Sequence, residues 1–126
     1  MFRIIPELTV DDMQRAMDFY CGILNFQVSM QDEEGNTNFV SLEKEDASLF
    51  LVTEDSRVET KREALKHNKR GVGVRLYFEV EDAGALHEEL KTRELAGLGE
   101  LSYNKNEDYT EFTLTDPDGY CLGFYS

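Results

Sequence analysis

The sequence predicts an α+β fold in which one unit, a strand followed by a helix and three strands, occurs twice. A chain of 126 residues with 40% hydrophobic residues, among them eight Phe and six Tyr, can bury a core without a metal or a disulfide. The halves also match each other. Val10-Asp11-Asp12 corresponds to Val80-Glu81-Asp82 at an offset of 70, and the hairpin 40–47 corresponds to 112–119 at an offset of 72. Two offsets this close indicate a duplicated module.

Apolar periodicity places the elements of the first half. Asp11 and Asp12 can cap a helix, whose apolar residues follow at helical spacing and whose end lies near Gly22. Residues 54–70 break the pattern and are polar, with a basic cluster near their end, so they predict a connector that is a solvated face or a lid. Strands are predicted where apolar residues alternate, at 4–10, 26–30, 40–42 and 49–52.

The second half repeats this order. Residues 72–80 are apolar at every even position and form the clearest strand of the chain. Asp82 is the next cap, for a helix that runs to about Ala96. Asp116-Pro117-Asp118-Gly119 has the residues of a type I turn. The remaining strands are predicted at 98–103, 112–114 and 122–124.

Charge and cysteine content exclude several classes of function. There are 13 Lys and Arg against 26 Asp and Glu, a net charge of −13, so nucleic acid and anionic membranes would be repelled. The longest apolar runs are too short to span a bilayer, and residues 1–6 do not resemble a signal peptide. Cys21 and Cys121 form no CxxC motif. We therefore expect a cytoplasmic protein with free thiols.

The stretch from Val10 to Phe26 resembles the opening of vicinal oxygen chelate proteins, the glyoxalase, bleomycin-resistance and extradiol dioxygenase superfamily. It carries Val-x-Asp, Ala16, Phe19-Tyr20 and a Leu-x-Phe in which Asn25 replaces the usual Gly. The turn 116–119 before a last apolar strand is a second shared feature. The resemblance covers essentially the whole chain.

This resemblance implies two βαβββ modules that form a cup-shaped mixed sheet with the helices packed outside. It gives a single domain, 1–126, with module one at about 1–55, a connector at about 56–71 and module two at about 72–126. It also implies a small-molecule ligand. We expect a homodimer, because relatives of this size commonly pair and because four-stranded sheets leave edge strands unpaired.

The resemblance also places metal ligands, usually His, Glu or Gln, on the first and fourth strand of each module. The corresponding positions here are Ile5, Leu51, Arg75 and Gly123. None of these side chains suits a divalent cation, and shifting each assigned position by one residue along the chain yields no metal-ligating side chain either. We therefore expect no metal and no other cofactor, as in the bleomycin-resistance group.

Other candidates for chemistry are weak in the sequence. His67 and His87 are expected to be solvated surface residues, although His87 begins an incomplete HExxH pattern in which Lys91 replaces the second His. Asp116 and Asp118 lack the further ligands of a calcium loop. Cys121 has no base that can be placed beside it, so a small, buried residue is expected there.

Strand parity predicts the lining of the cup, because odd positions face away from the helices. The ligand-binding residues predicted in this way are Glu7, Leu51, Arg75, Tyr77, Glu79 and Cys121. Arg offers a fork for a carboxylate or phosphate, and Tyr offers a ring for stacking. Two alternatives stay open: Arg75 could instead form an ion pair with Glu7 or Glu79, and either glutamate could act as a general base.

These observations favour a metal-free binding protein that sequesters a drug or metabolite, and no catalytic residue can be assigned. The alternative is an enzyme of the same superfamily, of the lyase, isomerase or dioxygenase type, that acts without a metal or with unusual ligands. A third possibility is a cup that is filled by the protein's own side chains.

Overall fold

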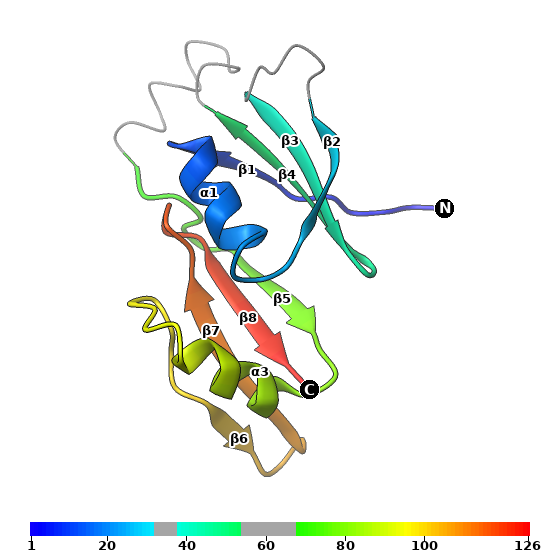
Figure 1. Cartoon of the computed structure of the whole chain (residues 1–126). Helices are drawn as coiled ribbons and strands as arrows, with labels where there is room; N and C mark the ends of the chain where they lie inside the picture. Colours follow the sequence, from blue (N-terminus) through cyan, green and yellow to red (C-terminus); the bar gives the residue numbers. More distant parts are fainter. Residues whose placement is uncertain (32–37, 54–67) are drawn as a thin grey trace. The chain divides into compact units, whose positions relative to one another are not determined.

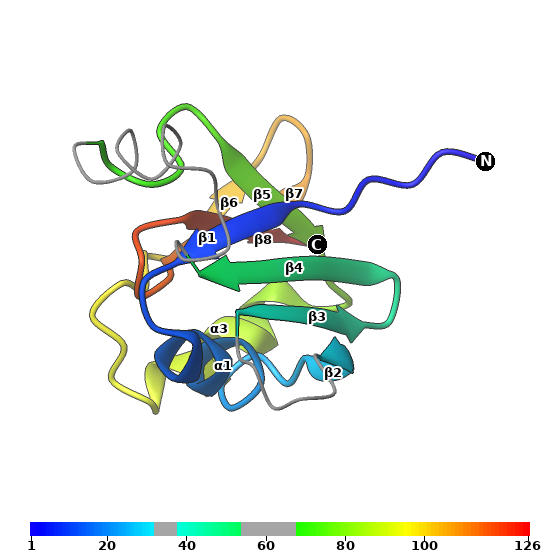
Figure 2. The ribbon, with the colours of Figure 1, turned by 90° about the horizontal axis from the view of Figure 1, so that it is seen from above.

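The computed structural model describes residues 1–31, 38–53 and 68–126, and these divide into two units, Met1–Arg70 and Gly71–Ser126. The predicted connector lies mostly outside the described residues. The first unit contains β1 (Glu7–Val10), α1 (Met13–Tyr20), β2 (Gln27–Gln31), β3 (Phe39–Lys44) and β4 (Ala47–Thr53). Its four strands form a mixed sheet in the order β1-β4-β3-β2, as Figures 1 and 2 show, with β1 parallel to β4 and the other neighbours antiparallel.

The second unit repeats this topology. It contains β5 (Arg75–Glu79), α3 (Ala83–Lys91), β6 (Ser102–Asn104), β7 (Tyr109–Thr115) and β8 (Cys121–Tyr125). The sheet order is β5-β8-β7-β6, again with a parallel first pair and antiparallel neighbours after it (Figure 1). The predicted α+β class and the duplicated order of a strand, a helix and three strands are therefore confirmed.

Each helix begins at the predicted cap. The Asp12 carboxylate accepts a hydrogen bond from the Arg15 backbone N–H at 3.0 Å, and Asp82 accepts one from Ala85 at 2.9 Å. These bonds satisfy donors that the first helical turn leaves without partners. The second helix is shorter than predicted and has Thr92 as its C-cap, because the backbone there turns away and Glu94 adopts a left-handed conformation with φ of 52°. None of the described helices is long and apolar enough to cross a membrane.

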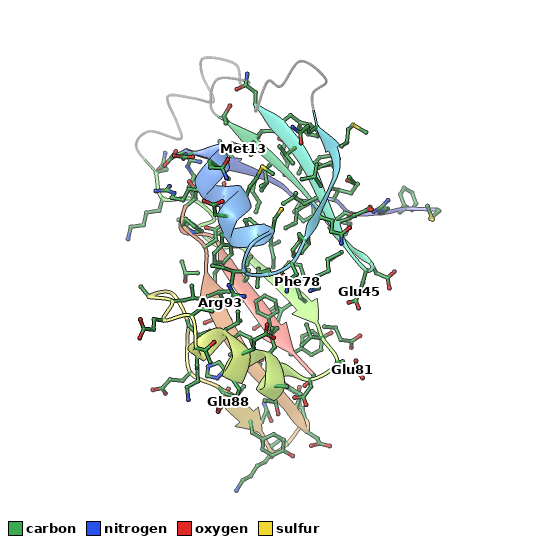
Figure 3. The ribbon with its side chains drawn as sticks, in the orientation of Figure 1. Met13, Glu45, Phe78, Glu81, Glu88 and Arg93 are labelled. Carbon is green, nitrogen blue, oxygen red and sulfur yellow. The ribbon has the colours of Figure 1, made fainter. Side chains whose placement is uncertain are left out.

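The core of each unit lies between its helix and one face of its sheet. In the first unit, α1 contacts β4, and in the second, α3 contacts β7. Phe124 stacks on both Phe112 and Phe78, with ring centroids 5.1 and 5.3 Å apart; Phe78 is labelled in Figure 3. The fully buried strand residues are Val10, Val40, Leu42, Leu49, Leu51, Phe112, Leu114 and Leu122. Each contributes about 1.5–3 kcal/mol relative to an exposed position.

Several strands begin later than apolar alternation predicts. Ile4 lies outside β1 and is 89% exposed, and Val72 and Val74 precede β5 and are 75% and 59% exposed. The reason in the second unit is local: Gly71 and Gly73 have φ of 70° and 81°, which breaks the extended conformation. The strand predicted at 98–103 is reduced to β6 and a single bridge between Leu98 and Leu114.

Arg70 differs from the solvated residue that the basic connector predicts. Its side chain is 7% exposed, forms an ion pair with Asp11 at 2.6 Å, and donates a hydrogen bond to the backbone carbonyl of Thr9. Arg70 therefore fixes the end of the first unit to the end of β1. The rest of the basic cluster, apart from the exposed Lys69, lies outside the described residues.

The predicted turn between β7 and β8 is confirmed, and Asp116 holds it together. This residue is 4% exposed, and one of its carboxylate oxygens accepts hydrogen bonds from the backbone N–H groups of Asp118 and Tyr120, both at 2.9 Å. The turn therefore depends on a side chain that substitutes for backbone partners.

We expect Asp116→Ala to lower the free energy of unfolding by about 1–3 kcal/mol, because two partly buried N–H groups lose their acceptor. Asp46→Ala is the matched control, since Asp46 is an exposed turn residue of the first unit and should change stability by no more than about 0.5 kcal/mol. Urea denaturation of the two variants checks this. Equal midpoints for both would show that the carboxylate does not hold the turn.

Candidate functional site

The candidate site is the face of the second sheet that points away from α3. Phe112, which contacts His87 of α3, lies in the core together with Leu114, Leu122 and Phe124. Side chains alternate along a strand, so the odd-numbered residues lie on the opposite face. We call this the outer face of the second sheet. Its members are Arg75, Tyr77, Glu79, Cys121, Gly123, Tyr125, Glu111, Thr113 and Thr115.

Strand pairing arranges these residues in three rows. The row at one end holds Arg75, Cys121 and Thr115. The middle row holds Tyr77, Gly123 and Thr113. The row at the other end holds Glu79, Tyr125 and Glu111. The face therefore changes from basic through aromatic to acidic along the strands.

Arg75 is exposed and oriented by its neighbour on the same strand. Its Nη1 donates a hydrogen bond to the Tyr77 hydroxyl at 3.2 Å, and its Cζ lies 5.9 Å from the centroid of the Tyr77 ring. The hydrogen bond to Tyr77, followed by the neighbouring Cys121, raises the pKa of Arg75, so the group stays charged. Among the described residues of the second unit, no carboxylate forms an ion pair with Arg75, and the alternative pair with Glu79 is not found.

Tyr77 lies against a glycine that leaves room for its ring. A Cβ added to Gly123 would stand 2.6 Å from Cε1 of Tyr77 and 2.7 Å from Cδ1, far inside contact distance. Tyr125 meets Tyr77 edge to face at a centroid distance of 6.0 Å. Tyr77 nevertheless remains 48% exposed. The absence of a side chain at Gly123 thus sets the position of a half-exposed aromatic surface.

The first sheet has a different outer face. Glu7 pairs with Phe50, Phe50 with Ser41, and Ser41 with Met30, which places a carboxylate, an aromatic ring and a thioether in one row. Phe50 also packs against Phe39, with ring centroids 5.1 Å apart. This face is more apolar than that of the second sheet. Glu7 lies on it, as predicted.

The prediction that Leu51 shares this face is wrong. Leu51 pairs with Leu8 and Val40 and is 0% exposed, so it belongs to the core on the helix side, as Leu49 does. The cause is the length of one turn. In the first unit, Lys44 pairs with Ala47 and two residues lie between them. In the second unit, the backbone N–H of Asp116 donates to the carbonyl oxygen of Tyr120 and three residues lie between them. One residue reverses the face of a strand, so the counterpart of Gly123 is Phe50.

Two further candidates are placed by the structure. Cys121 is half-buried in the row of Arg75. His87 is buried, which corrects the expectation of a solvated residue: its Nε2 bonds the Gly99 carbonyl oxygen at 2.8 Å and its ring meets Phe112 edge to face. His87 therefore belongs to the core, while His67 lies outside the described residues. Glu111 is a further residue of the outer face that was not predicted, and its odd position beside Phe112 is the sequence signal that places it there.

Comparison with known proteins identifies the family. The sequence pattern of the Glyoxalase/Bleomycin resistance protein/Dioxygenase superfamily matches residues 4–124, so the chain belongs to this superfamily. Among curated protein sequences, none matches the chain significantly.

Similar solved structures agree on the fold. An integron cassette protein from the mobile metagenome of the Halifax Harbour sewage outfall is 16% identical, with a TM-score of 0.73 over 100% of this chain and 99% of that one. Lactoylglutathione lyase from Agrobacterium tumefaciens is 17% identical, with a TM-score of 0.70 over 98% and 92%. The bleomycin-binding protein of Streptomyces verticillus, solved with copper(II)-bleomycin, is 22% identical, with a TM-score of 0.67 over 98% and 94%.

The positions that the family resemblance assigns to metal ligands do not suit a metal here. Two of them are Arg75, a permanent cation, and Gly123, against which the Tyr77 ring lies. The other two are Ile5 and, after the correction of register, Phe50. No group of three or more His, Cys, Asp or Glu side chains that could hold a metal occurs in the described ranges 1–31, 38–53 and 68–126. These side chains offer no donor set for a divalent cation.

We expect Gly123→Ala to lower the free energy of unfolding by about 1–3 kcal/mol, because the new methyl group overlaps the Tyr77 ring. In a Tyr77→Ala background the same substitution should cost at least about 0.5 kcal/mol less, because the space is then empty. Thermal and urea unfolding of the four proteins in this cycle measure the coupling.

Gly84→Ala is the control for this cycle. Gly84 lies in α3 with its nearest neighbour at 3.4 Å, so alanine there should be neutral or stabilising by up to about 1 kcal/mol. A cost of Gly123→Ala that Tyr77→Ala leaves unchanged would contradict the packing of Tyr77 on Gly123.

Proposed function

We propose that this chain is a binding protein that holds a small organic molecule on the outer face of the second sheet without a metal ion. The observation that carries the proposal is the arrangement of Tyr77, whose half-exposed ring is seated against Gly123 and whose hydroxyl accepts a hydrogen bond from Arg75. An ordered aromatic ring beside a cation provides both an apolar surface and a directional donor for a ligand. The membership of a superfamily with ligand-binding relatives supports this reading.

The absence of a general base beside a nucleophile favours binding over catalysis at this face. Cys121 is the only cysteine of the second unit, and its neighbours in the row are Arg75 and Thr115. Neither neighbour can accept a proton from a thiol in the way that histidine does. We therefore place sequestration of a drug or metabolite ahead of a metal-free lyase, isomerase or dioxygenase-type reaction.

The binding proposal is tested by thermal-shift screening of a small-molecule library, with hits confirmed by calorimetry. Tyr77→Ala should weaken the hits at least about tenfold, the loss expected for a buried aromatic contact. Tyr103→Ala is the control, because Tyr103 is 57% exposed on the core-side face of β6 and should leave the affinity unchanged. The bound compound, recovered and weighed by mass spectrometry, should be chemically unchanged.

Three results would overturn this proposal: no hit in the screen, an affinity that Tyr77→Ala does not alter, or a bound compound that is converted to a product. A separate experiment tests whether ligand binding needs a metal ion. Chelation with EDTA should not reduce the affinity, and added nickel or zinc should raise the melting temperature little, since a tightly bound ion would stabilise the folded state by mass action. Binding that requires either ion would contradict the metal-free site.

We also propose that the protein is a cytoplasmic homodimer. Each sheet by itself leaves two edge strands, β1 and β2 in the first and β5 and β6 in the second, whose backbone groups favour pairing. Cys21 and Cys121 are free thiols, as a reducing compartment would keep them. Light scattering should give twice the chain mass of 14.5 kDa, and a monomer at micromolar concentration would contradict the dimer.

A further inference from the structure

The outer face of the second sheet has charges of opposite sign at its two ends. Arg75 and Glu79 are the first and last residues of β5, and Glu111 joins Glu79 in the same row through Tyr125. A strand rises about 3.3 Å per residue, so the basic and acidic rows lie about 13 Å apart. Tyr77 lies between them, and Tyr125 stands beside it. A ligand on this face therefore meets a cation, an aromatic surface and a pair of carboxylates in that order.

These charges are not neutralised within their own unit. Among its described residues, Arg75 makes no ion pair, and neither Glu79 nor Glu111 does. The chain carries twice as many acidic as basic residues, 26 against 13, so Arg75 is one of relatively few cations in an acidic chain. One guanidinium N–H bonds the Tyr77 hydroxyl, and the planar fork keeps further donors for an anion.

We infer that this face orients an aromatic carboxylate, with its acid group on Arg75, its ring against Tyr77, and any group at the far end of the ring near Glu79 and Glu111. This inference rests on the proposed binding function and adds the class of the ligand and the direction in which it lies. The acidic row favours a cationic group at the far end and disfavours a second anion. Arg75 fixes one end, and the two glutamates select what the other end can be.

Elementary electrostatics sets the size of these effects. A hydrogen-bonded carboxylate on a guanidinium contributes about tenfold in affinity at an exposed position, at the weak end of the range for charged hydrogen bonds. The far-end effect is a charge–charge interaction at the protein surface and should be about threefold to fivefold. Both effects should shrink as the ionic strength rises, since the Debye length falls to about 8 Å at 0.15 M salt.

The experiment uses one ring system with varied charge. The first comparison is 2-naphthoate against 2-naphthamide, which has the same shape without the charge; the acid should bind about tenfold more tightly. The second comparison keeps the carboxylate and varies position 6: an aminomethyl group should strengthen binding about threefold relative to hydrogen, and a second carboxylate should weaken it by a similar factor. Calorimetry at low and moderate salt gives each affinity.

Matched variants assign the two effects to their residues. Arg75→Gln should abolish the preference for 2-naphthoate over 2-naphthamide, whereas Arg93→Gln, an exposed arginine after α3 that is labelled in Figure 3, should preserve it. The double variant Glu79→Gln with Glu111→Gln should remove the ranking at position 6. The double variant Glu88→Gln with Glu89→Gln, on the exposed side of α3, is its charge-matched control.

The outcomes separate this inference from the proposed function. If both naphthalene compounds bind equally and Tyr77→Ala weakens both, the face binds aromatic molecules and the inferred ligand class is wrong. If the acid is preferred but the position-6 ranking survives Glu79→Gln with Glu111→Gln, the inferred direction is wrong. If no naphthalene compound binds and the library screen also yields nothing, the proposed function itself fails.

Discussion

The parallel pairing of β5 with β8 is the constraint on which the candidate site depends. Its register places Tyr77 opposite Gly123 and Arg75 opposite Cys121. A slip of β5 by one residue would move Tyr77 to the core face and bring Leu76 and Phe78 to the outer face. That slip is opposed by the apolar core, because Phe78 stacks on the buried Phe124, which in turn stacks on Phe112. The hydrophobic core on one side of the sheet thereby fixes the chemistry on the other.

The duplicated modules share a backbone pattern but not a site. Where the second sheet has Gly123 and leaves room for a tyrosine ring, the first sheet has Phe50, which fills the corresponding space and packs on Phe39. At the position of Tyr77 in β5, β1 has Glu7, because these two residues pair with Gly123 and Phe50 respectively. Divergence at these pairs makes one outer face apolar with a carboxylate and the other aromatic with an arginine.

Signals that depend on one short segment were enough to predict most of the fold. The caps Asp12 and Asp82 and the turn that Asp116 closes all act within a few residues of themselves, so the sequence around them contains the whole cause. Leu51 was assigned to the wrong face because its side depends on the turn between β3 and β4. That turn is one residue shorter than its counterpart between β7 and β8, and a constant offset between the modules does not show this difference. His87 was assigned to the surface because its partners, Gly99 and Phe112, are distant in sequence.

The same limit applies to charge. A net charge of −13 describes the field that a ligand meets at long range, and it opposes the approach of an anion. At contact distance the net charge of the chain matters less than the positions of the nearest charges. Salt screens charges that lie beyond about 8 Å, while a hydrogen-bonded pair is screened far less. Arg75, held by Tyr77 and raised in pKa by that bond, can therefore act as a local cation in an acidic protein. The acidic residues on the same sheet face then limit which anions bind at Arg75. A second negative group on the ligand would lie close to Glu79 or Glu111 and would be repelled.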